Sequence, residues 1–226
     1  MYRDDMASMG AQSTGSVIAV VGASGRTGQR VVTELTARGY GVRALMRSPA
    51  AASARSPGVE YVKADVLDPS GLGDCLMGCS AVVSALGVGS SRTPTTVYSH
   101  GITAIHAAMT AAGVRRISTI SAAPVGPRAE QPFLDRRLAM PILDRIFGAT
   151  YQDMARMESL LAGTDLQFVC LRPPRLVDRP AKGHYRLGIG SPPDHGRRIT
   201  CSDLATALID VLDSPGLARR AIYVSN

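Results

Sequence analysis

The feature that most constrains this chain is an apolar strand pattern that runs directly into a glycine-rich turn. Residues 17–28 read V-I-A-V-V-G-A-S-G-R-T-G, and a helical apolar pattern follows. Gly22 permits a tight turn, Gly25 has no Cβ to keep out a phosphate, and Gly28 lets the helix pack close to the strand. The helix N-terminus presents unpaired N–H groups to an anion. A glycine turn alone could be purely structural, but the strand-turn-helix context favours a dinucleotide-binding turn.

The second strand indicates which dinucleotide is bound. NAD-binding folds usually end this strand with Asp or Glu, which holds the ribose 2′-hydroxyl. Here residues 42–47 read V-R-A-L-M-R, so Arg47 takes that place, and Arg26 and Arg43 are nearby candidates. Because a guanidinium can hold a 2′-phosphate through two hydrogen bonds, NADP(H) is preferred over NAD(H). The alternative is that Arg47 is merely a solvated strand end.

Length and composition limit the remaining possibilities. The 226 residues suit one sizeable α/β domain, expected over 16–226, after a disordered leader at 1–15 in which Met6 or Met9 could be the true start. The formal charge of +7 comes from scattered arginines, and no nucleic-acid-binding motif accompanies it. We therefore expect a small-molecule substrate and no nucleic-acid partner.

Location and metal content follow from what the sequence lacks. The polar N-terminus has no apolar signal-peptide stretch, and no run approaches 18 apolar residues. We expect a cytoplasmic protein with no membrane partner. The four cysteines show neither metal-ligand spacing nor a disulfide framework, so no metal site is predicted.

Strand and helix patterns alternate along the chain, which is typical of a doubly wound parallel sheet between two helical layers. We predict an α/β, Rossmann-like, three-layer fold in a single domain with a small, loop-rich C-terminal substrate region. Strands are expected near 17–22, 42–46, 59–63, 80–85, 115–120, 166–171 and 221–224. Helices are expected near 26–38, 69–77, 95–112, 134–162 with a break at Pro141, and 202–212 with Ser202 or Thr200 as its cap.

In such a sheet, ligands bind beyond the carboxyl ends of the strands. The residues at that edge should therefore line one cleft. They are the 22–28 turn, Arg47, Asp65, Leu86, Gly87, Ser121, Pro173 and Pro174. Asp65 could accept from the adenine amino group, Val66 could cover the ring, and Ser121 could hold a substrate carbonyl or ring nitrogen. Gly87 could equally be an ordinary turn glycine, and Ser121 a strand-end cap.

The chain lacks a motif on which one common type of reduction depends. Ordinary short-chain dehydrogenases use Tyr-x-x-x-Lys, in which the lysine lowers the tyrosine pKa for proton transfer. The two lysines are Lys63 and Lys182, and the residues four positions before them are Val59 and Asp178. The motif is absent from the chain, which excludes alcohol or ketone chemistry by that route.

Several motifs in order resemble the atypical short-chain reductases, most closely the family of biliverdin reductase B, the NADPH-dependent flavin reductase. They are G-A-S-G-R-T-G at 22–28, G-Y-G-V-R-A-L-M-R at 39–47, A-D-V-L at 64–67, P-T-T-V at 94–97, I-S-A at 120–122, R-P-P-R-L-V-D-R-P at 172–180 and R-I-T-C-S-D-L-A at 198–205. The resemblance implies a Rossmann-like monomer that passes hydride from NADPH to a flat conjugated acceptor such as a flavin, quinone or bilin.

The resemblance also implies roles for individual residues. Ser121 matches the family's active-site serine, and Arg47 would hold the 2′-phosphate. The pyrophosphate would be held by Gly22, Ser24, Gly25, Thr27 and Gly28, and Arg26 would be a further cofactor contact. Arg92, Tyr98 and Tyr151 are candidate substrate contacts. Where the family has histidines, this chain has Met154 and Arg175, and Arg175 could bind a phosphate of the cofactor or an acidic substrate group.

Three questions stay open at this point. The proton donor is unassigned, because His184 and His195 lie in a loop-rich region and water could serve instead. A non-catalytic NADP(H)-sensing regulator of NmrA type is the alternative function. A nucleotide-sugar epimerase or dehydratase is disfavoured, since only about 55 residues follow the sixth strand.

Overall fold

The computed structural model describes residues 15–49, 56–89, 91, 93–133 and 135–226. At its centre is an eight-stranded sheet in the order β3-β2-β1-β4-β5-β6-β10-β8, parallel throughout except for the antiparallel pair of β10 and β8. The strands are β1 (Val17–Val21), β2 (Gly41–Met46), β3 (Val59–Lys63), β4 (Cys79–Ser84), β5 (Arg116–Ile120), β6 (Gln167–Arg172), β8 (Arg186–Gly188) and β10 (Arg220–Ser225). β7 (Arg175–Val177) and β9 (Arg198–Thr200) form a separate parallel ribbon.

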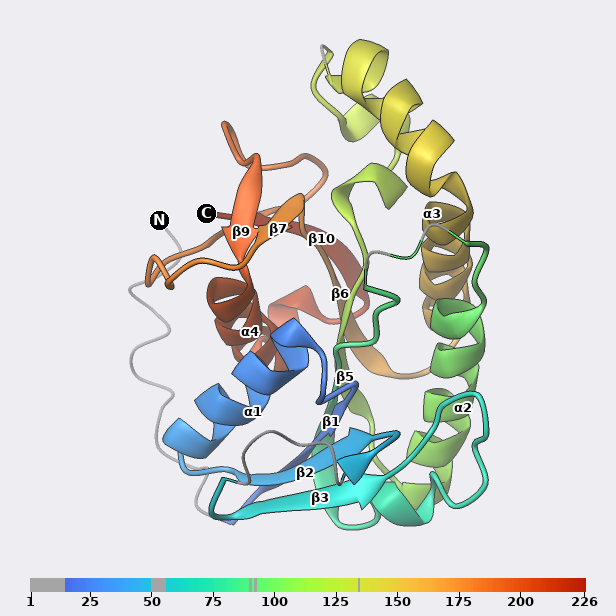
Figure 1. Ribbon diagram of the computed structural model, residues 1–226, viewed down its shortest axis with the longest axis vertical. Helices are drawn as coiled ribbons and strands as arrows, with labels where there is room; N and C mark the ends of the chain where they lie inside the picture. The colour runs from blue at the N-terminus through green and yellow to red at the C-terminus, as the bar shows by residue number, and fades with distance from the viewer. Residues whose placement is uncertain (1–14, 50–55, 90, 92, 134) are drawn as a thin grey trace.

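Helices cover both faces of the sheet, as Figure 1 shows. α1 (Arg26–Ala37) and α4 (Cys201–Asp210) pack together on one face, and α2 (Val97–Ala112) and α3 (Met140–Ala162) pack together on the other. Each helical layer buries its own apolar cluster against the sheet. Because both faces are covered, the inner strands are apolar almost throughout, as in the Val17–Val21 run. The predicted doubly wound, three-layer fold is confirmed.

The expected elements largely form where the patterns placed them. All seven predicted strands are present, and so are the helices expected at 26–38, 95–112 and 202–212. α4 is capped by Thr200, whose side chain accepts a hydrogen bond from the Asp203 amide. Thr200, of the two candidates, is therefore the cap. The three short strands β7, β8 and β9 were not expected.

Two predicted helices need correction. Residues 69–77 contain only the 3-10 turn Asp74–Leu76, because Gly71 has a positive φ of 78° that ends any regular helix there. The helix expected from 134 starts instead at Met140, after a π-helical turn at Asp135–Ala139. Pro141 is therefore the second residue of α3 and does not break it, since proline is tolerated in a first turn.

The strand order reverses between β1 and β4, and this is where a doubly wound sheet opens a crevice for a ligand. The turn after β1 comes very close to the end of β4. Gly22 has a φ of 76°, and a Cβ there would lie 2.8 Å from the carbonyl oxygen of Ala85. Only glycine fits both requirements, so the backbone path at the crevice depends on this residue.

Candidate functional site

A cleft of about 760 Å³ runs along the carboxyl ends of the strands, from β3 and β2 across to β6. It collects residues that are far apart in the sequence. The predicted site residues that line it are Gly22, Ser24, Gly25, Arg26, Thr27, Arg47, Asp65, Val66, Leu86, Gly87, Tyr98, Ser121, Tyr151 and Pro173. The fold therefore brings most of the predicted positions together in one continuous space.

The glycine turn forms one wall of the cleft. Gly25 is the N-cap of α1, and having no side chain, it leaves the first-turn N–H groups without a side-chain cap. A Cβ at Gly25 would lie 3.3 Å from the carbonyl oxygen of Gly22. Gly28 lies behind the cleft, where a Cβ would come within 2.2 Å of the same oxygen. First-turn amides without a side-chain cap, next to glycines without side chains, are what a bound pyrophosphate requires.

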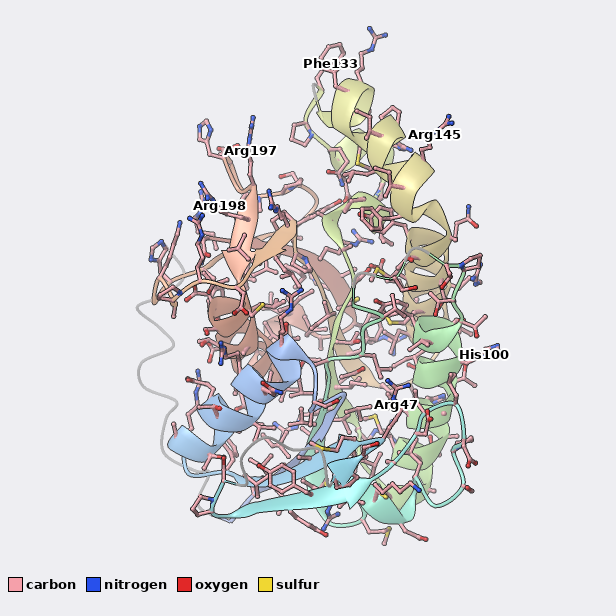
Figure 2. The ribbon with its side chains drawn as sticks, viewed as in Figure 1. Arg47, His100, Phe133, Arg145, Arg197 and Arg198 are labelled. Atoms are coloured by element: carbon pink, nitrogen blue, oxygen red, sulfur yellow. The ribbon has the colours of Figure 1, made fainter. Side chains whose placement is uncertain are left out.

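Two arginines supply positive charge to this wall. Arg26 and Arg47 both line the cleft and are exposed, and neither has a hydrogen bond or ion pair within the described ranges (Figure 2 labels Arg47). Arg43 is committed elsewhere. Its guanidinium pairs with Glu60 at 2.6 Å and donates to the carbonyl oxygens of Cys75 and Met77. Arg43 therefore cannot assist Arg47, whereas Arg26 can.

Asp65 and Val66 lie at the same end of the cleft. Asp65 Oδ1 accepts a hydrogen bond from the Leu67 amide at 3.0 Å, which fixes the carboxylate and leaves Oδ2 available. The neighbouring Val66 is buried. A Cβ on Gly101 of α2 would meet Leu86 at 2.7 Å, so that glycine allows the helix to approach this wall. Asp65 thus offers one acceptor beside an apolar surface, as an adenine ring requires.

Ser121 follows β5 at the middle of the cleft. It is 2% exposed, and its hydroxyl has no hydrogen-bond partner among the described residues. The hydroxyl lies beside the Cys170 thiol, whose pKa burial raises and Ser121 lowers, but not in the geometry of a hydrogen bond. A buried hydroxyl without a partner is costly, which makes Ser121 a candidate contact for a polar group of a ligand.

One face of α3 forms the opposite wall. Phe147, Thr150, Tyr151 and Met154 all line the cleft, at the i, i+3, i+4 and i+7 spacing of a single helix face. The Phe147 and Tyr151 rings are 6.0 Å apart and tilted by 50°, and burial and Asp144 raise the pKa of the Tyr151 hydroxyl. The Thr150 hydroxyl is buried and, like that of Ser121, has no partner in the described part of the chain.

Phe147 and Thr150 were not among the site residues predicted from the sequence. The helical spacing from Tyr151 and Met154 would have found them, because both lie on the same face of the helix. On the side away from Arg47, the cleft therefore has an aromatic pair and two hydroxyls without hydrogen-bond partners among the described residues.

The hydrogen bonds of Tyr98 connect parts of the protein to each other. It is buried, which raises the pKa of its hydroxyl, and this oxygen accepts a hydrogen bond from the Val88 amide at 3.4 Å. The Tyr98 amide in turn donates to the buried carboxylate of Asp153 at 2.9 Å. Tyr98 therefore anchors the loop after β4 to α2 while its ring faces the cleft.

Other candidate residues either do not line the cleft or lie outside the described residues. Arg175 lies outside the cleft, because successive residues of β7 face opposite sides and it is Leu176 that lines the cleft. His184 and His195 are exposed and do not line the cleft either. Arg92 and the leader at 1–14 lie outside the described residues.

The comparisons with known proteins agree with this geometry. Residues 22–215 match the NAD(P)H-binding family. A short-chain dehydrogenase/reductase from Veillonella parvula DSM 2008, in complex with NADP, is 17% identical with a TM-score of 0.78, covering 93% of this chain and 94% of that one. A candidate NADH-flavin reductase from Streptococcus pneumoniae TIGR4 is 24% identical with a TM-score of 0.75, covering 94% and 100%.

An oxidoreductase from Lactococcus lactis is similar in the same way, at 20% identity and a TM-score of 0.77 over 93% of this chain and 90% of that one. At such identities the likeness shows the fold. Within the described ranges, no helix has the length and apolar character needed to cross a membrane. The family match extends from the glycine turn through α4 and so includes every residue that lines the cleft except Val21. This chain belongs to the NAD(P)H-binding family.

Proposed function

We propose that this protein is an NADPH-dependent reductase that passes hydride to a flat conjugated small molecule such as a flavin, quinone or bilin. One observation carries the proposal. A single cleft joins an uncapped helix N-terminus with two unpaired arginines to a region with two unsatisfied buried hydroxyls and an aromatic pair. The first part suits a phosphorylated dinucleotide, and the second suits a planar acceptor with polar ring atoms.

The preference for NADPH over NADH rests on charge. Arg47 follows β2, where a carboxylate would otherwise hold a ribose 2′-hydroxyl, and the nearby Arg26 adds a second cation. Both guanidiniums lack a protein partner among the described residues, so neither has to break an ion pair to bind a 2′-phosphate. The bound cofactor would supply the hydride, and Ser24, Gly25 and Thr27 would hold its pyrophosphate.

The class of acceptor follows from the far side of the cleft. Phe147 and Tyr151 present ring surface from α3, against which a conjugated ring system can pack. The Ser121 hydroxyl would donate to a carbonyl oxygen or ring nitrogen of the acceptor, with Thr150 as a second donor. The motif resemblance to the biliverdin reductase B family supports the same class of acceptor.

Proton transfer places a further limit on the acceptor. The chain has no Tyr-x-x-x-Lys, and neither lysine lines the described cleft. Acceptors whose reduced form takes its proton from water, such as flavins and quinones, need no such pair. In this proposal Ser121 polarises and orients the acceptor, and it is not a general acid.

Steady-state oxidation of NADPH with FMN as acceptor tests the proposal, with NADH alongside. Ser121→Ala should lower kcat/KM about tenfold, the usual effect of removing one hydrogen bond to a reacting group. Ser118→Ala is the matched control. Ser118 lies on β5, the strand that Ser121 follows, and is also buried without a partner in the described structure, but it does not line the cleft. Equal losses in both variants would contradict the role of Ser121.

A second function is favoured by the missing proton-transfer pair. A non-catalytic NADP(H)-sensing protein would keep the cofactor half of the cleft and need no proton donor. It predicts NADPH binding by calorimetry without turnover of FMN, a benzoquinone or biliverdin. That result would replace the reductase proposal, whereas turnover of any of these acceptors with a preference for NADPH would exclude the sensor.

A further inference from the structure

The ribbon of β7 and β9 separates two hollows. Leu176, in the middle of β7, lines the cleft, while Arg175 and Val177 on either side of it face a second hollow of about 230 Å³. The remaining residues of this second hollow are Arg179, Arg197 and Arg198. Figure 2 shows Arg197 and Arg198 at the β9 end of the molecule, well away from Arg47. The arginine hollow, as we call this group of residues, is thus distinct from the cofactor cleft.

No carboxylate in the described part of the chain is paired with the arginines of the arginine hollow. Arg175 pairs directly with Arg198 in the register of the ribbon, and like charges placed opposite each other on neighbouring strands repel. Within the described ranges, none of the four arginines makes an ion pair or a side-chain hydrogen bond. Eight of the other described arginines do have a carboxylate partner, namely Arg30, Arg38, Arg43, Arg115, Arg116, Arg128, Arg156 and Arg172.

The nearest carboxylates in the sequence do not neutralise the arginine hollow. Asp178, next to Arg179, pairs with Arg30 of α1 at 3.5 Å. Asp194, in the loop before β9, contributes its backbone oxygen to Arg186, and its carboxylate is not paired with any of the four arginines. Four arginines therefore line one hollow, and no carboxylate of the described residues is paired with any of them.

We propose that the arginine hollow binds a small multivalent phosphate anion, a pyrophosphate group or the phosphates of a nucleoside diphosphate or triphosphate. Guanidiniums bind phosphate oxygens through paired, charge-assisted hydrogen bonds, and four of them match an anion with several charges. The hollow is smaller than the about 300 to 1,000 Å³ of typical ligand sites, so it suits a phosphate group and not a whole dinucleotide. Its arginines converge on one hollow, which favours a small anion over a nucleic-acid backbone.

The site has a structural connection to the cleft. An anion held by Arg175 and Arg198 would join the two strands of the ribbon, and Leu176 on the opposite face of β7 contacts the cleft. Ligands in the two hollows would therefore touch opposite sides of the same three-residue strand.

Calorimetric titration of the full chain with pyrophosphate tests the proposal, with and without saturating NADP⁺. We expect binding to one site that persists when NADP⁺ is present. The double variant Arg175→Gln/Arg198→Gln should weaken it at least about tenfold, since two charge-assisted contacts are lost. Arg137→Gln/Arg145→Gln, which removes two exposed arginines that line neither hollow, is the charge-matched control and should leave binding unchanged.

Several outcomes would overturn the site. They are the absence of pyrophosphate binding, unchanged binding by the double variant, and equal affinity for inorganic phosphate, which would argue against a multivalent ligand. Loss of binding on Arg47→Gln would place the anion in the cleft instead. Thermal unfolding supplies a second readout, because removing two repelling charges should not lower the Tm of the free protein. Pyrophosphate should raise the Tm of the wild type and of the control variant but not that of the double variant Arg175→Gln/Arg198→Gln.

Discussion

A side-chain carbon on Gly28 would lie 2.2 Å from the carbonyl oxygen of Gly22, so the first turn of α1 rests directly on the turn that precedes it. Alanine at position 28 must push α1 away from β1. We expect Gly28→Ala to lower the free energy of unfolding by about 2 to 3 kcal/mol, the usual cost of overpacking, and to weaken binding of NADPH. Chemical denaturation and calorimetry would measure the two effects.

The matched control for this variant is Gly148→Ala in α3. A Cβ there meets no atom within 4 Å. Because alanine is the better helix former, this change should leave stability unchanged or raise it by about 0.5 to 1 kcal/mol. Similar destabilisation by both substitutions would show that the contact with Gly22 is not the cause.

Arg47 is expected to decide the choice between the two cofactors. Its exposed guanidinium lines the cleft without a partner in the described structure. Arg47→Ala should weaken NADPH binding by about 1.5 to 3 kcal/mol and leave NADH nearly unchanged, because only NADPH carries the 2′-phosphate. Dissociation constants for both cofactors test this. Equal losses for NADPH and NADH would refute the assignment, and Arg26→Ala would then show whether Arg26 takes this role.

The sequence predicted those parts of the fold that rest on long, regular patterns. The strands from β1 to β6 and β10 are segments of five or six residues, and their order along the chain was enough to place Ser121 and Asp65 at one edge. The helix expected at 69–77 failed because Gly71 adopts a conformation that apolar spacing does not report.

Side-chain direction was harder to predict than position. Arg175 lies only two residues from Pro173 of the cleft wall, yet β7 turns it to the opposite side, and a strand of three residues is too short to leave a periodic signal. The pairing of β7 with β9 joins residues more than twenty positions apart. The convergence of Arg175 with Arg198 therefore depends on tertiary structure.

Asp153 should be important for stability without touching the cleft. Its carboxylate is fully buried and accepts hydrogen bonds from the Tyr98 and Ser99 amides and from the Ser99 hydroxyl at the start of α2. Asp153→Ala leaves these donors unpaired, so we expect a loss of about 3 kcal/mol in unfolding free energy. Asp165→Ala, which removes an exposed carboxylate next to Arg115 and His106, should cost less than about 1 kcal/mol. Denaturation midpoints would distinguish the two.

Asp203 should make stability depend on pH in acid. Burial alone would raise the pKa of its carboxyl, but hydrogen bonds from the Thr200 hydroxyl, the Lys182 and Gly183 amides and Asn226 lower it below the usual 3.8. The unfolded chain then binds the proton at a higher pH than the folded chain does. The stabilisation is therefore complete above about pH 4 and is lost as the pH falls through the folded pKa.

Asp203→Asn should remove this dependence, because an amide does not titrate. Unfolding free energies measured between pH 2 and pH 6 should fall towards acid more steeply for the wild type than for the variant. At pH 6 the variant should be the less stable protein, since a neutral amide is a weaker acceptor for the Lys182 and Gly183 amides. Parallel pH profiles for the two proteins would mean that other carboxylates cause the acid sensitivity.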